Sequence, residues 1–182
     1  MEEQAGTTTL EEHLRGFWPG REPEPVTWTD GPVLERLPDF VTYRIAQRAP
    51  DRGWNYATVG ASAHGGTEFV LMAPFDTDDH AETLAMVAHF NSFEEHRVDV
   101  GSVLHLGRPW TGTSRMEHLL FSPPYPYGPL LEQAPGGVRY LWLLPVHASE
   151  AEVILTEGPE VFEELLEAEG IDILAIDRPP VV

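Results

Sequence analysis

The sequence predicts an α+β fold: a mixed, mainly antiparallel sheet with helices on its faces, in a single domain. Three observations predict it. Strand-like segments follow one another through short links between residues 39 and 73, which is typical of an antiparallel meander. A nearly unbroken apolar segment at residues 138–146 has the pattern of a strand buried on both faces. Segments with helical apolar spacing lie between and after these strands.

The first 25 residues are predicted to be a tail, a short helix and a connector, ahead of a main domain at residues 26–182. Residues 1–8 are polar. Thr9 and Glu12 have the spacing of a capping box, and Leu10, Leu14 and Phe17 then fall on one helical face. The polar, proline-containing residues 21–25 would carry this helix onto the surface of the domain.

The middle of the chain is predicted to supply most of the sheet. Strands are expected at residues 39–46, 54–62 and 67–73, with turns at residues 50–53 and 65–66. A longer helix opens at Asp79 and runs to about Phe93. Two more strands are expected at residues 101–106 and 116–121, followed by an irregular segment rich in proline and tyrosine at residues 122–128.

The last quarter is predicted to form a scaffold of one strand, two helices and a closing strand at residues 171–176. A capping box at Ser149 and Glu152 starts one helix, and Gly158-Pro159 ends it and starts another. The buried faces of the two helices are expected to hold Ala151, Ile154 and Leu155, and Phe162, Leu165 and Leu166, respectively.

Composition excludes several functions. The 182 residues include no cysteine and no lysine, which excludes disulfides, cysteine metal sites, thiol nucleophiles, Schiff-base lysines and the P-loop. Thirty acidic residues against 11 basic ones give a formal charge of −19, which repels phosphate backbones, so no nucleic-acid partner is expected. No apolar run approaches a membrane span, and the acidic N-terminus does not resemble a signal peptide. We expect a cytoplasmic protein without a membrane partner.

No catalytic, cofactor or metal site is predicted. Among eight histidines, none forms an i,i+4 pair, and the closest metal candidate is His80 beside the acidic residues at positions 76, 78 and 79. Acids at that position more often cap a helix.

Residues 60–64 partly match a nucleophile elbow, but His64 replaces its last glycine and a strand follows, so they are interpreted as a strand end entering a turn. Glu68, Asp99 and Asp177 are interpreted as ordinary surface or turn carboxylates. A small Ser/Asp/His hydrolase is the alternative that we keep.

Two candidate contact regions remain. Arg108 and Trp110 combine a cation and an aromatic ring in one loop, which suits a contact surface, although Trp110 folded back over the core is the alternative. Residues 149–169 contain eight glutamates and no base. The acids of the second helix that lie off its apolar stripe are candidate partner-binding residues, a solvated face being the alternative: Glu160, Glu163, Glu164 and Glu167.

The ordered motifs of the chain resemble a known family. They are Trp-Asn-Tyr-Ala-Thr-Val-Gly at residues 54–60, Thr-Glu-Phe-Val-Leu at 67–71, Gly-Ser-Val at 101–103 through Pro-Trp at 109–110, Trp-Leu-Leu-Pro-Val at 142–146, Ser-Glu-x-Glu at 149–152, Glu-Gly-Pro-Glu at 157–160 and Asp-Arg at 177–178. Over about residues 39–178 this set resembles the bacterial stand-alone type of the Suppressor of fused (SUFU) domain family.

The resemblance implies the same α+β architecture and a protein-interaction module rather than an enzyme. Bacterial stand-alone members are proposed immunity proteins that neutralise co-produced toxins, so a protein partner is expected, a basic toxin being one candidate. An adaptor without a toxin is the alternative. Animal members clamp a peptide between this domain and a second one, and because the chain stops at Val182 that clamp is not expected here.

Overall fold

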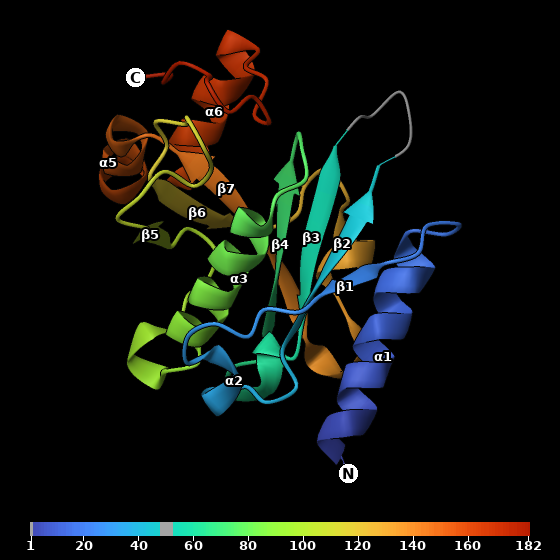
Figure 1. Cartoon of the computed structure of the whole chain (residues 1–182). Helices are drawn as coiled ribbons and strands as arrows, with labels where there is room; N and C mark the ends of the chain where they lie inside the picture. Colours follow the sequence, from blue (N-terminus) through green and yellow to red (C-terminus); the bar gives the residue numbers. More distant parts are fainter. Residues whose placement is uncertain (1, 48–52) are drawn as a thin grey trace.

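The computed structural model describes residues 2–47 and 53–182, so the turn predicted at residues 50–53 lies outside the described residues except for Gly53. The described chain forms one seven-stranded sheet in the order β1-β2-β3-β4-β7-β6-β5 (Figure 1). Its strands are β1 (Glu24–Val26), β2 (Val41–Ala46), β3 (Trp54–Val59), β4 (Thr67–Ala73), β5 (Val103–His105), β6 (His118–Ser122) and β7 (Arg139–Val146). Among these described strands, only the β4–β7 pair is parallel. The predicted α+β class, with a mixed and mainly antiparallel sheet, is confirmed.

Helices cover both faces of the sheet, and α5 and α6 lie together at the end of the molecule that carries the C-terminus (Figure 1). They are α1 (Glu2–Phe17), α2 (Val33–Arg36), α3 (Asp78–Asn91), α4 (Pro129–Glu132), α5 (Ala148–Glu157) and α6 (Pro159–Glu169), with short 3-10 helices η1 (Ala61–His64), η2 (Glu94–His96) and η3 (Pro135–Gly137). Among the described residues, no helix is both long enough and apolar enough to cross a membrane.

The core has two halves, one on each face of the sheet, because strand side chains alternate. In β4, Val70 and Met72 join the half that contacts α1, α4, α5 and α6. Phe69 and Leu71 join the other half, under α2 and α3. A strand covered on both faces needs apolar residues at most positions, which explains the sequences of β4 and β7 beyond their first residues.

The predicted strand at residues 138–146 is confirmed, but the closing strand at residues 171–176 is wrong. Both edges of β7 are already occupied, by β4 on one side and β6 on the other. Residues 171–176 therefore cannot pair with β7. They form turns instead, and in one of these the Leu174 amide donates to Asp172 Oδ1 at 3.0 Å. Ile173 and Leu174 still pack against the core.

Two helix starts differ from the prediction. The helix α1 already begins at Glu2, so residues 2–8 are not the predicted tail. The cap of α5 is His147, whose backbone N–H donates to Glu150 at 2.8 Å, rather than the predicted pair of Ser149 and Glu152.

One face assignment in α5 also needs correction. Ala151 and Ile154 are buried as predicted, but Leu155 is 71% exposed. It follows Ile154 directly, about 100° around the helix, and that rotation places it outside the buried face.

Candidate protein-binding surface

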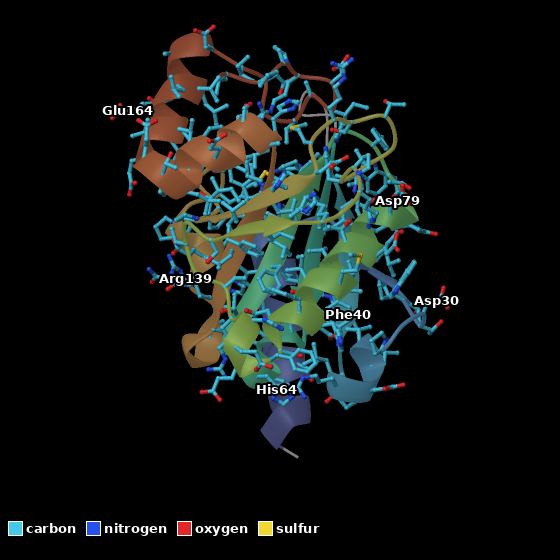
Figure 2. The ribbon with its side chains drawn as sticks, turned by 90° about the vertical axis from the view of Figure 1, so that its left-hand side faces the viewer. Asp30, Phe40, His64, Asp79, Arg139 and Glu164 are labelled. Atoms are coloured by element: carbon cyan, nitrogen blue, oxygen red, sulfur yellow. The ribbon has the colours of Figure 1, made fainter. Side chains whose placement is uncertain are left out.

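The helix α6 separates its apolar and acidic residues as the sequence predicts. Gly158, at a φ of 104°, ends α5, and Pro159 starts α6. Phe162 is fully buried, and Leu165 and Leu166 are partly buried. The four acids off this stripe, Glu160, Glu163, Glu164 and Glu167, are called the α6 glutamates below. All are exposed except the half-buried Glu163, and Figure 2 shows Glu164 projecting away from the body of the molecule.

The α6 glutamates have no counter-ion among the residues that the structure describes. Across the described residues, none of the ion pairs includes any of the four. Glu160 and Glu164, and likewise Glu163 and Glu167, stand at i,i+4 spacing, where like charges destabilise a helix. Partial burial and the negative charges of Glu160 and Glu167 raise the pKa of Glu163 above its usual value. This face of the molecule therefore carries concentrated, uncompensated negative charge.

A groove of about 650 Å³ runs beside this face. Four parts of the chain supply it: β7, α6, the irregular segment at residues 122–128 and the turn that follows α6. Its lining residues are Ser122, Tyr125, Pro126, Trp142, Leu144, Glu163, Leu166, Glu167, Gly170, Ile171 and Ile173. We call this the acidic groove. It combines an apolar interior with two of the α6 glutamates, a combination that the sequence did not reveal because the residues 122–128 and α6 are far apart in the chain.

Tyr125 is the most prominent aromatic residue in the acidic groove. Its side chain is unusually open, with 61% of the residue exposed. Partial burial, together with the negative charges of Glu163, Glu160 and Glu132, raises the pKa of its phenol. The ring therefore lies within the field of the α6 glutamates. Exposed aromatic residues beside an apolar depression are typical of protein contact surfaces.

A buried ion pair holds the chain that follows the acidic groove. Arg178 donates to both carboxylate oxygens of Glu150, at 2.6 and 2.7 Å, and also to the carbonyl oxygen of Pro145 at 3.1 Å. The amides of His147 and Val181 donate to the same carboxylate. Burial alone would raise the pKa of Glu150, but these hydrogen bonds and the guanidinium charge lower it. The pair fixes the C-terminal segment against the end of β7.

The loop residues Arg108 and Trp110 lie elsewhere, against α3. Arg108 donates to Glu82 at 3.3 Å and to Thr83 at 3.1 Å. Trp110 is only 2% exposed, and its indole N–H donates to Ser114 at 3.0 Å. The contact-surface interpretation of Trp110 is therefore corrected in favour of the alternative, a ring folded over the core. The fold does not bring this pair together with the α6 glutamates, which lie beyond the opposite face of the sheet.

His80 lies beside Trp110 in a cluster of aromatic rings. Its ring is fully buried, stacks on Trp110 with 5.3 Å between ring centroids, and meets Tyr56 edge-on. Burial lowers the pKa of His80 to about 4. The neighbouring Asp76 instead accepts hydrogen bonds from Tyr56 and Arg44. In the part of the chain that the structure describes, no three potential ligands converge as a metal ion would require.

Glu68 is an ionisable residue whose predicted position is wrong. It was expected at the surface but is completely buried. Its carboxylate accepts from the amides of Gly60, Ala61 and Ser62 at 2.9–3.2 Å and from the Thr58 hydroxyl at 2.6 Å. Burial raises its pKa despite these hydrogen bonds. The sequence signal for this burial was a single acid in an otherwise largely apolar strand. In the structure, the Glu68 carboxylate holds η1 against β4.

Comparisons with known proteins agree with this architecture. A family model described as Suppressor of fused protein (SUFU) matches residues 39–179. Immunity protein YqcF of Bacillus subtilis (strain 168) is 29% identical over 143 residues, covering 70% of this chain and 74% of that protein. The crystal structure of a SUFU homolog from Neisseria gonorrhoeae FA 1090 is 36% identical, with a TM-score of 0.90 and 98% coverage of both chains.

Two more distant structures share the fold. The structure of a Sufu–Fu complex matches with a TM-score of 0.74 at 17% identity, covering 97% of this chain and 92% of that one. Drosophila Suppressor of Fused matches with a TM-score of 0.72, also at 17% identity, over 97% of this chain and 51% of that one. At such identities the likeness is one of fold alone.

Proposed function

Because this chain belongs to the Suppressor of fused (SUFU) family, we propose that it is a non-enzymatic protein-binding domain of the immunity type. It binds a toxin, most suitably a basic one, and neutralises it by covering or mimicking a binding surface. Residues 26–182 form the SUFU-like domain of this proposal, with residues 1–25 as its N-terminal extension. Leu10 and Leu14 of that extension are buried against the sheet, so we expect both parts to unfold together.

The observation that carries the proposal is the uncompensated charge of the α6 glutamates beside the acidic groove. Such a face costs folding free energy through like-charge repulsion, and a basic partner would offset that cost. Opposite charges across an interface also speed association and exclude wrong partners. The relationship to Immunity protein YqcF supports the toxin as the kind of partner.

Three buried polar residues and one exposed histidine form internal contacts that support binding rather than catalysis. Glu68 and Glu150 are both saturated by internal donors, and the Tyr140 hydroxyl donates to the carbonyl oxygen of Thr58 at 2.9 Å. His64 Nε2 lies 3.2 Å from the carbonyl oxygen of Arg36, so the ring of that histidine is engaged with backbone and not with Ser62. Groups engaged in this way hold the fold together and are poorly placed to move protons for a substrate.

The experiment is capture followed by a growth assay. Tagged protein captures partners from an extract of the source organism, and each captured protein is then expressed in a bacterial host with and without this chain. The proposal expects growth arrest by the partner alone and rescue by co-expression. Rescue should fail when the α6 glutamates are replaced by arginine. A captured protein that never impairs growth would contradict the toxin and favour an adaptor.

A matched control separates local from overall charge. Glu12, Glu35, Glu94 and Glu95 are exposed and lie outside α6. Replacing these four by arginine changes the net charge by the same amount as the α6 variant. This control variant should still rescue growth. If both variants fail equally, overall charge rather than the α6 face is responsible.

A further inference from the structure

We propose that the acidic groove is the receptor for a single arginine side chain of the partner. Its aliphatic stem would lie along the apolar interior, and its guanidinium would pair with Glu163 and Glu167 beside the Tyr125 ring. This inference rests on the proposed function, since it specifies what the acidic face recognises. It goes beyond general charge attraction because it names one anchor and the residues that receive it.

The interior of the acidic groove suits an aliphatic stem. Trp142, Leu144, Leu166, Ile171 and Ile173 contribute apolar surface to it. Its volume of about 650 Å³ falls within the range of specific ligand pockets, so a long side chain and its neighbours fit. Arginine covers apolar surface with its methylene groups while it keeps its charged end at the rim.

The rim supplies carboxylates that form no ion pair within the described part of the chain. Two arginines at the ends of β7 pair with other acids: Arg139 pairs with Glu132 at 2.8 Å and with Asp99 at 3.4 Å, and Arg178 pairs with Glu150. Glu163 and Glu167 stand one helical turn apart on α6 and both line the groove. A planar guanidinium with five donors can bond to two carboxylates at once, which an ammonium group does less well.

Tyr125 adds a contact that favours a cation. It lines the groove together with the two carboxylates and is 61% exposed, so its ring is open to an incoming group. Guanidinium groups stack favourably on aromatic rings, and the attraction grows when water is excluded. An acidic anchor would meet the repulsion of Glu163 and Glu167, and a neutral anchor would leave both carboxylates without a counter-ion.

The test uses two peptides and does not require the partner. The probes are acetyl-Leu-Arg-Leu-amide and its citrulline counterpart, which keeps the shape but removes the charge. Each is titrated into isotope-labelled full-length protein and followed by NMR. We expect saturable shifts for the arginine peptide at the Leu166 methyls and the Gly170 and Ile171 amides. The citrulline peptide should bind at least about tenfold more weakly, as expected when charge-assisted hydrogen bonds are lost.

Variants localise the effect. Glu163→Gln with Glu167→Gln should weaken the arginine peptide at least about tenfold, whereas Glu152→Gln with Glu157→Gln, two exposed acids of α5, should leave it unchanged. Tyr125→Phe should keep the affinity and Tyr125→Ser should lower it, since the ring and not the hydroxyl makes the contact. Protein spectra without peptide verify that each variant is folded.

The outcomes are distinct from those of the growth assay. Absent shifts, shifts scattered over other acidic residues, or equal binding of both peptides would overturn the arginine receptor. A captured toxin that is neutralised as well by the Glu163→Gln, Glu167→Gln variant would also overturn it while leaving the proposed function intact. Peptide shifts confined to the groove, with a captured protein that is harmless, would uphold the receptor and contradict the immunity role.

Discussion

At the residue scale, two buried glutamates hold the fold together, and their pKa values are shifted in opposite directions. Burial raises the pKa of Glu68, whereas the hydrogen bonds and charge around Glu150 lower its pKa against the effect of burial. Glu150 therefore adds stability above its unfolded pKa, and that stability is lost as the pH falls through its folded pKa. The contribution of Glu68 is complete below its unfolded pKa and declines as the pH rises through its folded pKa.

Replacing Arg178 with methionine should lower the free energy of unfolding by roughly 3–5 kcal/mol at neutral pH, because Glu150 would remain buried without its base. Urea melts measure the effect. The loss should shrink in acid as Glu150 becomes protonated, and adding Glu150→Gln should recover part of it. The control is Arg15→Met, whose exposed ion pairs are worth about 1 kcal/mol or less. Equal losses in the two variants would refute the buried pair as a stabilising contact.

The variant Glu68→Gln should lower the free energy of unfolding by roughly 1–3 kcal/mol, because an amide nitrogen would face backbone N–H donors that a carboxyl oxygen, protonated or not, can accept from. Here the loss should be largest in acid and should decline as the pH rises, the reverse of the Arg178 variant. Melts of both proteins over the same pH series provide the comparison. Parallel pH profiles would mean that the two carboxylates do not differ as described.

At the element scale, α6 is attached through one face and open on the other. Phe162 is fully buried with Leu165 and Leu166 partly buried beside it, whereas all the α6 glutamates but the half-buried Glu163 are exposed. The α6 glutamates can therefore change without disturbing the attachment of the helix. This separation is what makes charge-reversal experiments on α6 interpretable.

A pair of alanine variants tests that separation. Phe162→Ala should lower the free energy of unfolding by about 3–5 kcal/mol, as for other buried aromatic residues. Leu155→Ala should change it by no more than about 0.5 kcal/mol, because little of that side chain is buried. Denaturant melts of both variants decide the matter. A large effect at Leu155 would show that this side chain is covered in solution.

Several elements could be predicted from sequence because a local pattern determined them. The strand β4 was predicted with its observed bounds, Thr67–Ala73, and the apolar spacing of α6 identified its buried stripe. The segment at residues 171–176 was equally strand-like, yet whether it can pair depends on free sheet edges, which are a property of the whole topology. Local pattern cannot report that.

The candidate site, too, could be predicted only in part from the sequence. The exposure of most of the α6 glutamates followed from helical spacing. The acidic groove did not, because Tyr125 and Glu163 meet only in the folded chain. The buried positions of Trp110 and Glu68 were likewise set by the folded chain, which stacks His80 on Trp110 and places the turn at Gly60 over the Glu68 carboxylate. Loop aromatics and single strand carboxylates carry too little local information to place.

At the scale of the whole molecule, the chain carries a formal charge of −19, and the acidic face of α6 lies at the end opposite the N-terminus (Figure 1). Charge of this size attracts a basic protein over a distance set by the ionic strength. If α6 is the docking face, the attraction should act through it specifically. The central claim is therefore that the α6 glutamates govern association with a protein partner.

The most direct measurement is the association rate constant of the captured partner over a series of salt concentrations. It compares the natural protein, the variant with the four α6 glutamates changed to arginine, and the control variant at Glu12, Glu35, Glu94 and Glu95. The account predicts fast association that falls steeply with salt, a loss of at least about tenfold in the α6 variant, and a much smaller loss in the control. Association that is indifferent both to salt and to the α6 reversal would contradict it.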